Sequence, residues 1–375
     1  MVIKKEIRTR KSQYMLKVLS IVKPWMMAWM CVAAPLMSQN SPSTGVVSSE
    51  NDTGSFQRMM AGYNAPSSLG LNASWDIFVT GSFIYWQPSE DNLALGVPSN
   101  MTSMALPYYG TVVNMDFGFK PGLKVGLGAD VRRDHWVLYS EYTWLQSTDR
   151  KSFSAAGSNL AINYWAHPNR YTTFLTTVSG EWQVHLNLLD LVLQRSYFVG
   201  SQLTFTPFFG LRAAWIDQQY LTENTEQTTL LVYQTFQKST SWGVGPRTGL
   251  DADWLLGYGI RFYGKTMADL LYTQYGRHIV YQNPSTPSTM EDINVHEYGI
   301  ETLRSHAEIE LGFGWGSSLS RDRMYIDLAA GYDFQVFWRQ NMFIEYVDNV
   351  SISDYVARDG NLYLQGLTAS LRLDF

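Results

Sequence analysis

One stretch of the chain fits a phosphate-binding motif. Residues 259–266, GIRFYGKT, match the pattern GxxxxGK[ST], in which a glycine-rich loop and a lysine hold the phosphates of a nucleotide. Backbone N–H groups can converge on a phosphate only when the residues between the glycines are small, and here they are bulky. The alternation of a strand also continues through Arg261 and Tyr263. We therefore interpret the motif as a chance match inside a strand.

The six histidines are the other residues whose chemistry could serve catalysis or metal binding. Histidine is a common general base and metal ligand near neutral pH. His185 shares a predicted strand face with Glu181, and His306 shares one with Glu308 and Glu310. A site requires convergence across strands, which spacing within one strand does not establish. We therefore assign no catalytic residue, no metal and no cofactor. The six are His135, His167, His185, His278, His296 and His306.

Period-two alternation predicts the strands that would position these residues. In the cleanest run, 114–131, the odd positions are mainly apolar and the even positions are glycine, lysine, aspartate or asparagine. Such a period places successive side chains on opposite faces of a strand, and no helix tolerates that density of glycine. Together the segments predict about ten strands, within a range of 8–12. They are 76–86, 114–131, 135–146, 178–192, 202–216, 242–254, 256–263, 305–315, 324–338 and 361–375.

The predicted connections alternate in length. Short turns at the periplasmic end, long external loops and an even strand number are typical of outer-membrane barrels. The sequence therefore predicts an all-β fold, a transmembrane antiparallel up-and-down β-barrel over residues 75–375, in the bacterial outer membrane. The long connections are 87–112, 147–172, 217–240, 265–303 and 339–360, and the short ones are 132–134, 194–200, 255 and 317–323.

Composition agrees with a surface that faces lipid. Only 16% of the residues are charged, against about 25% in soluble domains, and the chain carries 13 Trp and 23 Tyr. Tryptophan and tyrosine concentrate at the two membrane–water interfaces. The chain ends on alternating residues 367–375 with a terminal aromatic, which resembles the closing strand of an outer-membrane barrel. We expect Phe375 to act as the assembly signal.

The first 74 residues do not alternate. Seven basic residues precede the apolar stretch 24–37, which is too short to span a membrane, and together they predict a signal peptide at 1–38. Residues 39–74 are rich in Ser, Asn, Gly and Pro and predict a flexible periplasmic segment. Loss of the signal peptide removes the only cysteine, and the net charge falls to about −11. This composition excludes a disulfide framework and a basic nucleic-acid footprint.

The face opposite the lipid-facing residues is polar and mostly charged, which predicts a hydrated, mixed-charge constriction that screens small solutes by size and sign. Ten strands would leave a narrow lumen, because open channels are typical of 16 to 18 strands. Inward glycines such as Gly118, Gly122 and Gly126 lower the side-chain bulk and would widen it. The pore-lining candidates are Asp116, Lys120, Lys124, Glu141, Glu181, Arg212, Arg247, Asp251, Arg261, Glu308, Glu310, Asp327, Asp333 and Arg372.

Three stretches carry a family resemblance. They are FIYWQPSE at 83–90; WQVHLNLLD at 182–190, continuing to PFFGLR at 207–212; and WGVGPRTGL at 242–250, continuing to Leu271. On these residues the chain resembles the Legionella-type pore-forming outer-membrane proteins, a major-outer-membrane-protein-like family also found in environmental chlamydiae. The resemblance implies an outer-membrane barrel with pore activity and supplies no catalytic residue. The chain lacks the many cysteines of chlamydial major porins, so a disulfide-scaffold role is excluded.

Three functions remain open at the level of sequence. The first is a pore for passive diffusion of small solutes and ions, with a mild preference for cations because of the acidic excess. The second is a structural or adhesive surface protein that acts through its external loops, and the third is a barrel hydrolase. The expected partners are outer-membrane lipid, the barrel-assembly machinery and small solutes or ions, with a homo-oligomer possible in principle and nucleic acid excluded.

Overall fold

The computed structural model describes residues 77–100, 109–131, 136–157, 159–165, 175–199, 201–227, 230–282, 291–319, 324–346, 355–357 and 359–375. These residues belong to one compact unit, Gly54–Phe375. The predicted signal peptide at 1–38 and the predicted flexible segment at 39–74 lie outside them. Every regular element of the described residues is a strand. Nowhere among them is there a helix long and apolar enough to cross a membrane.

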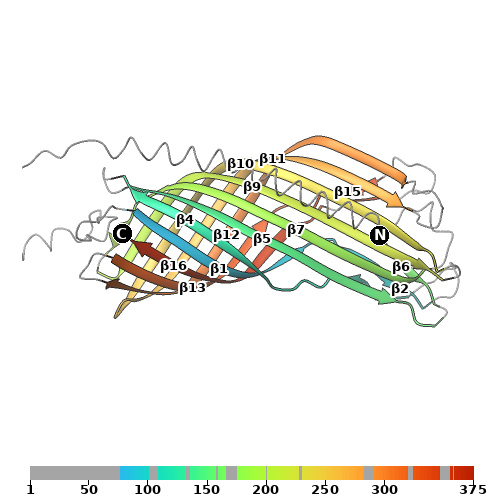
Figure 1. Ribbon diagram of the computed structural model, residues 1–375, viewed down its shortest axis with the longest axis horizontal. Coiled ribbons are helices and arrows are strands. Elements are labelled where there is room, and N and C mark those ends of the chain that lie inside the picture. The colour runs from blue at the N-terminus through green and yellow to red at the C-terminus, as the bar shows by residue number, and fades with distance from the viewer. Residues whose placement is uncertain are drawn as a thin grey trace, which may run out of the picture. The chain divides into compact units, whose positions relative to one another are not determined.

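Ten antiparallel strands form a closed wall (Figure 1). Each pairs with its neighbours in chain order, and β1 pairs with β16 to close the ring. The predicted fold class and strand number are therefore confirmed. The wall strands are β1 Ile77–Glu90, β4 Lys120–Asp130, β5 Val137–Ser154, β7 Leu175–Gln194, β9 Leu203–Glu226, β10 Val232–Gly257, β11 Ile260–Gln282, β12 Glu291–Leu319, β13 Met324–Phe337 and β16 Leu362–Asp374.

Six short strands accompany the wall. Of these, β2 pairs with β3 and β6, β8 pairs with the start of β9, and β14 pairs with β15. They are β2 Ala94–Pro98, β3 Val113–Asn114, β6 Ala161–Asn163, β8 Tyr197–Val199, β14 Ile344–Tyr346 and β15 Tyr355–Ala357.

The register fixes the tilt of the wall. Directly paired residues, followed once around the ring from Glu90, return to β1 at Phe78, a stagger of 12 residues. With a rise of about 3.3 Å per residue and about 4.8 Å between strands, this stagger tilts ten strands by about 40°. That tilt is within the range of transmembrane barrels.

The outer face carries one apolar band. On β9 the outward residues from Phe205 to Trp215 span ten residues, or about 25 Å along the barrel axis at this tilt, the height of a membrane-facing band. Tryptophans mark its outer boundary: Trp215 is directly opposite Trp242, whose indole N–H donates to Gln274 Oε1 at 2.9 Å. The exposed fractions of Trp215 and Trp242 are 42% and 43%, as expected for a girdle in contact with lipid.

Six wall strands continue well beyond this boundary. Figure 1 shows β5, β7, β9, β10, β11 and β12 extending to the right, away from the labelled C-terminus, while the other four strands stop. The predictions of long loops at 217–240 and 265–303 were therefore wrong. Both regions are mostly strand, because their alternation continues with the two faces exchanged.

The exchange is clearest on β7. Near the membrane Asp190 points inward and Leu189 and Leu191 point outward, whereas farther out Trp182 and Leu186 point inward and are fully buried. Lipid favours apolar side chains on the outside of the wall, and water favours them on the inside. The projecting part therefore has the apolar core of a soluble sheet.

Segments between the wall strands fold onto this core. Leu95 of β2 lies fully buried in it, and Trp165 donates its indole N–H to Ala94 O at 2.8 Å. Trp165, Tyr220 and Phe343 form an aromatic cluster with ring centroids 5.0–6.3 Å apart. These residues pack into the end of the barrel away from the C-terminus (Figure 1), and we call Leu95, Trp165, Tyr220 and residues 340–344 the mouth plug.

Candidate functional site: the barrel lumen

A layer of charged side chains crosses the lumen within the membrane band. Eight of the ten wall strands contribute to it, because inward positions at the same height come together when the sheet closes. All of its members except Lys265 and Glu141 have at most 9% of the side chain exposed. We call this set the ionic layer: Lys124, Glu141, Asp190, Arg212, Arg247, Lys265, Asp269, His306, Glu308, Glu310 and Asp333.

Arg212 is the most tightly bound member of the ionic layer. Its Nε and Nη2 donate to the two carboxylate oxygens of Asp190 at 2.6 and 2.7 Å, and Nη1 donates to Asp269 Oδ2 at 3.0 Å. Arg247 also donates to Asp269, at 3.0 Å, and to Glu308 at 3.3 Å. Bidentate arginine–carboxylate pairs combine geometric specificity with strong hydrogen bonds. This half of the layer is a rigid brace across β7, β9, β10 and β11.

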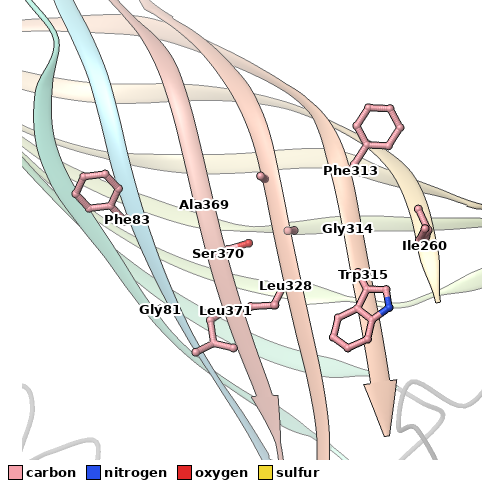
Figure 2. Close-up of a pocket in the computed structure, with 12 residues that line it drawn as sticks. Gly81, Phe83, Ile260, Phe313, Gly314, Trp315, Leu328, Ala369, Ser370 and Leu371 are labelled. Carbon is pink, nitrogen blue, oxygen red and sulfur yellow. The ribbon is translucent and has the colours of Figure 1, made fainter. Parts of the chain in front are cut away.

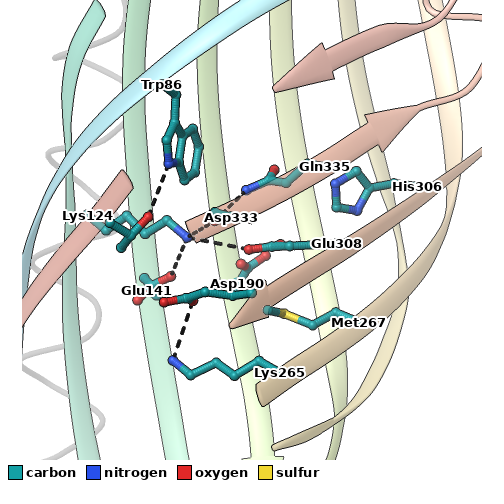
Figure 3. A network of polar contacts seen from close by, with 12 residues as sticks. Trp86, Lys124, Glu141, Asp190, Lys265, Met267, His306, Glu308, Asp333 and Gln335 are labelled. Atoms are coloured by element: carbon teal, nitrogen blue, oxygen red, sulfur yellow. Dashed lines mark hydrogen bonds and ion pairs between the residues drawn. The ribbon is translucent and has the colours of Figure 1, made fainter. Parts of the chain in front are cut away.

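Lys124 is held more loosely. Its Nζ lies 3.5 Å from Glu308, 3.6 Å from Asp333 and 4.0 Å from Glu141, and it stands 4.8 Å above the ring of Trp86. Figure 3 shows these side chains around the lysine. Glu308 and Asp333 belong to β12 and β13, on the opposite side of the ring from Glu141 on β5. Lys124 therefore ties two sides of the wall through three acceptors at similar distances.

The ionic layer has an acidic excess. It contains six carboxylates and four permanent cations, with His306 as an additional titratable group. Lys265 pairs with Glu310 at 3.8 Å, and Tyr263 donates to the same carboxylate at 2.6 Å. An acidic lumen attracts cations and repels anions.

Inward glycines make room for neighbouring side chains. A Cβ added to Gly128 would lie 2.6 Å from Phe78 Cε2 and closer still to two other ring atoms, and one added to Gly314 would lie 2.7 Å from the Arg261 guanidinium carbon. At these two positions a neighbouring side chain takes the space that the glycine leaves, so neither glycine widens the lumen there. Phe78 and Arg261 lie across the glycines and fill the space.

Nearer the C-terminus, further ion pairs occupy the interior. Arg261 binds Asp327, with Nη2 2.8 Å from Oδ1, and its Nε lies 2.9 Å from Asp253. Arg372 pairs with Asp374 at 2.6 Å and stacks on Phe78, 3.7 Å from the ring centroid. Charged and aromatic side chains thus project into the described lumen at every level from the C-terminal end to the mouth plug, although Lys265 keeps 40% of its side chain exposed.

Most of the predicted lining residues point into the barrel. Two do not. Glu181 lies on the outer face of β7, paired at 2.8 Å with Arg150, whose side chain is 67% exposed. Asp116 precedes β4, and its side chain is 72% exposed and bound to Lys151. The inward residues are Lys120, Lys124, Glu141, Arg212, Arg247, Asp251, Arg261, Glu308, Glu310, Asp327, Asp333 and Arg372.

Asp190, Asp269 and Lys265 are members that the sequence analysis missed. Asp269 and Lys265 lie in the region predicted as a loop, although their odd numbers match the inward Arg261 and Tyr263. Asp190 lies where the faces of β7 exchange. The apolar residues that precede it on the same face led us to expect that this face meets lipid. Continued alternation through 265–275 was the signal that could have placed Asp269 and Lys265.

The His306–Asp269 pair is closed to substrates in this state. His306 Nδ1 lies 2.6 Å from Asp269 Oδ2, the geometry of a general-base pair, but both side chains are fully buried in the ionic layer. His185 lies on the outer face of β7, apart from them. The pair therefore acts in the packing of the lumen, and it does not support the hydrolase hypothesis.

The P-loop-like stretch is a strand and not a phosphate loop. Gly257, Tyr258 and Gly259 form the tight turn between β10 and β11 and all have positive φ, which glycine adopts without strain. Residues 260–266 then continue as β11, and Lys265 binds Glu310. No nucleotide site forms here.

A hollow of about 610 Å³ lies on the outer, lipid-facing side of the wall (Figure 2). Phe83, Ala369, Ala330 and Phe313 are directly opposite one another on β1, β16, β13 and β12, so two phenylalanines flank a floor of alanine. The lining is mainly apolar, with Ser370 and the Trp315 indole as its polar side chains, and it lies within the membrane band. Its chemistry suits hydrocarbon.

The mouth plug is held by buried polar groups above the membrane band. Gln237 both donates to Ile344 O at 2.8 Å and accepts from Ile344 N at 3.0 Å. Glu90, the last residue of β1, accepts from Gln218 at 2.8 Å, and burial raises its pKa well above the usual range. Burial likewise raises the pKa of Tyr275, which donates to Gln340, to about 12.

Comparison with known proteins places this geometry in a family. The model of the Legionella pneumophila major outer membrane protein precursor matches residues 70–375, which include the whole barrel. No curated protein sequence gives a significant match.

Solved structures with a related fold are outer-membrane barrels. The outer membrane protease OmpT of Escherichia coli covers 82% of this chain and 99% of its own at 9% identity, with a TM-score of 0.36. A FadL homologue of Pseudomonas aeruginosa covers 80% and 89% at 8% identity, with a TM-score of 0.24. The toluene transporter TodX of P. putida covers 84% and 92% at 8% identity, with a TM-score of 0.18. At this distance they carry no inference about activity.

Proposed function

The chain belongs to the Legionella major outer membrane protein family, and from this premise we propose that it is a gated, narrow pore for small cations. The protein is an outer-membrane β-barrel. The ionic layer is the proposed gate, and the mouth plug is a second barrier in series with it. The observation that carries the proposal is the loose coordination of Lys124 by three carboxylates.

Exchange between acceptors is the physical basis of the gate. Breaking a buried ion pair without replacement costs about 3–5 kcal/mol. Lys124 can leave Glu308 for Glu141 while keeping a carboxylate partner, so this movement avoids most of that cost. A move toward β5 would release the tie to β12 and β13 and open a hydrated path beside acidic side chains. The acidic excess supports a preference for cations.

The crowded lumen supports small openings instead of a wide channel. Ten strands enclose little space, and neighbouring side chains take the space beside inward glycines such as Gly128 and Gly314. The mouth plug must also move, which requires loss of the two hydrogen bonds between Gln237 and Ile344. We therefore expect rare, low-conductance events and exclusion of larger solutes.

Planar-bilayer recording tests the proposal. Purified full-length protein should show brief, small, cation-preferring openings. Lys124→Ala should raise the open fraction and the cation preference, because it removes the tie and one positive charge. Lys238→Ala is the matched control, since Lys238 lies on the outer face of the projecting part of β10, and it should leave conductance unchanged.

The results that would refute the proposal require folded protein. Anomalous migration of unheated protein on an SDS gel, abolished by boiling, would establish that each preparation is folded. If folded wild type and folded Lys124→Ala both gave no conductance steps, the gate and the pore would be refuted together. Equal effects of Lys124→Ala and Lys238→Ala would refute the gate while sparing the pore.

The second candidate is a structural or adhesive surface protein. It is favoured by the projecting strands, whose apolar core and docked plug make a solid extracellular body. Substitutions on its outer face, such as Arg150→Ala with Glu181→Ala, should then reduce attachment to host cells or neighbouring envelope proteins. Under the pore proposal the same variants would leave attachment and conductance unchanged.

We propose no enzymatic activity, since the His306–Asp269 pair is sealed within the lumen. As partners we propose outer-membrane lipid around the apolar band, small cations in the lumen, and the barrel-assembly machinery at Phe375. Phe375 donates its backbone N–H to Ile77 O at 3.0 Å and so lies at the seam that closes the ring.

A further inference from the structure

Arg304 is a buried cation that lacks a carboxylate partner. It lies on the inner face of β12, two residues before His306 of the ionic layer, and only 9% of the residue is exposed. Three other buried arginines, Arg212, Arg247 and Arg277, each bind a carboxylate. No Asp or Glu among the described residues forms an ion pair with Arg304, whose side chain binds neutral groups instead.

The groups that contact Arg304 do not offset its charge. Nε donates to the hydroxyl oxygen of Tyr275 at 3.2 Å, and Nη2 donates to Met342 Sδ at 3.3 Å. The guanidinium carbon also lies 5.4 Å from the centre of the Tyr275 ring. A phenol is neutral and a thioether is a weak acceptor. Nη1 forms no hydrogen bond with the described residues, so this end of the guanidinium can still donate.

Carboxyl groups in the same part of the interior do not supply the missing negative charge. Glu90 accepts from Gln218 at 2.8 Å, and burial raises its pKa well above the usual range, which favours the neutral acid. Asp269 of the ionic layer is bound by Arg212 at 3.0 Å. One positive charge therefore remains uncompensated beside Met342 of the mouth plug.

An uncompensated buried charge favours a counter-ion. Burial of an unpaired charge is costly, so an anion bound to Arg304 would stabilise the folded barrel. A carboxylate suits a guanidinium, because two N–H groups of the planar fork can donate to its two oxygens. The edge formed by Nη1 and Nη2 is the one that can receive it, since Nε is bound to Tyr275 and the thioether is easily displaced from Nη2. A single positive charge is matched by a monoanion.

We propose that Arg304 is the centre of a binding site for a small carboxylate solute, between the ionic layer and the mouth plug. Tyr275 supports the guanidinium from one side and is itself fixed by donating to Gln340 at 2.9 Å. Met342 covers the other contact. A solute that passed the mouth plug would meet Arg304 before the ionic layer. The site does not depend on opening of the ionic layer, so it is independent of the proposed gate.

Urea unfolding of the full-length protein in phosphatidylcholine vesicles tests the site, with acetate as the probe. Sodium acetate replaces sodium chloride at constant ionic strength and pH 7.5, and tryptophan fluorescence gives the unfolding midpoint. The wild-type midpoint should rise with the logarithm of acetate concentration once the site fills, because a ligand that binds only the folded state stabilises it. Arg304→Gln should lose this rise. Arg150→Gln, which removes an exposed guanidinium on β5, is the matched control and should keep it.

A third variant tests recognition of the carboxylate itself. Arg304→Lys keeps the charge without the planar fork, so it should need at least about tenfold more acetate for the same rise. A general salt effect of acetate would appear equally in every variant. The site would be refuted by no rise in wild type or by an equal rise in Arg304→Gln, and an equal rise in Arg304→Lys would overturn the assignment to carboxylate. The gel-shift test establishes that each variant is folded.

Discussion

Gly128→Ala tests whether the lumen is filled near the C-terminal end of the barrel. The added Cβ would lie 2.6 Å from Phe78 Cε2 and nearer to two other ring atoms, whereas ordinary contact begins near 3.4 Å. The phenyl ring cannot move aside easily, because it is stacked at 5.7 Å on Tyr139 and covered by the Arg372 guanidinium at 3.7 Å. Overpacking of this kind costs about 1–3 kcal/mol in the free energy of unfolding.

Three further variants test whether contact with the Phe78 ring causes this loss of stability. Gly81→Ala is the control, because a Cβ there meets nothing within 4 Å, and it should change stability by less than about 0.5 kcal/mol. Phe78→Ala alone should cost about 3–5 kcal/mol. Adding Gly128→Ala to Phe78→Ala should then cost little, which corresponds to a coupling energy of about 1–3 kcal/mol in a double-mutant cycle.

Urea unfolding in lipid vesicles, followed by tryptophan fluorescence, measures these differences. The reasoning would be refuted if Gly128→Ala were as harmless as Gly81→Ala. That result would mean that the Phe78 ring swings freely into open space, and hence that the lumen is wide at this level. A large effect of Gly128→Ala that persisted in the Phe78→Ala background would point instead to backbone strain.

Three further predictions concern the mouth and the seam. Because burial raises the pKa of Glu90, the mouth plug should be most stable at acid pH. It should lose stability as the pH rises from the ordinary carboxyl pKa toward the raised pKa. Hydrogen exchange of residues 340–344 measures this dependence, and Glu90→Gln should remove it. Gln237→Ala should speed that hydrogen exchange at all pH values, since it removes the side chain that binds the backbone of Ile344. Unchanged exchange would contradict the proposal that Gln237 holds the mouth plug. Deletion of Phe375 should impair assembly, whereas Arg372→Ala should assemble normally and at most alter conductance; gel mobility and bilayer recording decide.

Local alternation predicted the wall well where one face meets lipid. Residues 120–130 and 324–335 keep one pattern, so their inward residues Lys124 and Asp333 were placed correctly, whereas Asp116 lies before β4 and is exposed. The prediction failed for Glu181, because β7 keeps its geometry while its environment changes from lipid to water. Period two reveals that a strand has two faces, and only the surroundings determine which face is inside.

The ionic layer shows the same division. Lys124 and Glu308 are 184 residues apart, and their contact depends on ring closure and on a stagger of 12 residues, neither of which is encoded by spacing within a strand. Whether an inward glycine opens the lumen or receives a ring likewise depends on the neighbouring strand, as Gly128 and Phe78 show.

The sequence by itself determined the class of fold, the strand number, the lipid-facing band and the family resemblance, because each rests on patterns repeated within single segments. The tertiary structure alone decided that the members of the ionic layer meet across the lumen and that six strands project beyond the membrane. These features arise from register and inversion of the faces, which exist only after the strands pair and the environment of each face is set.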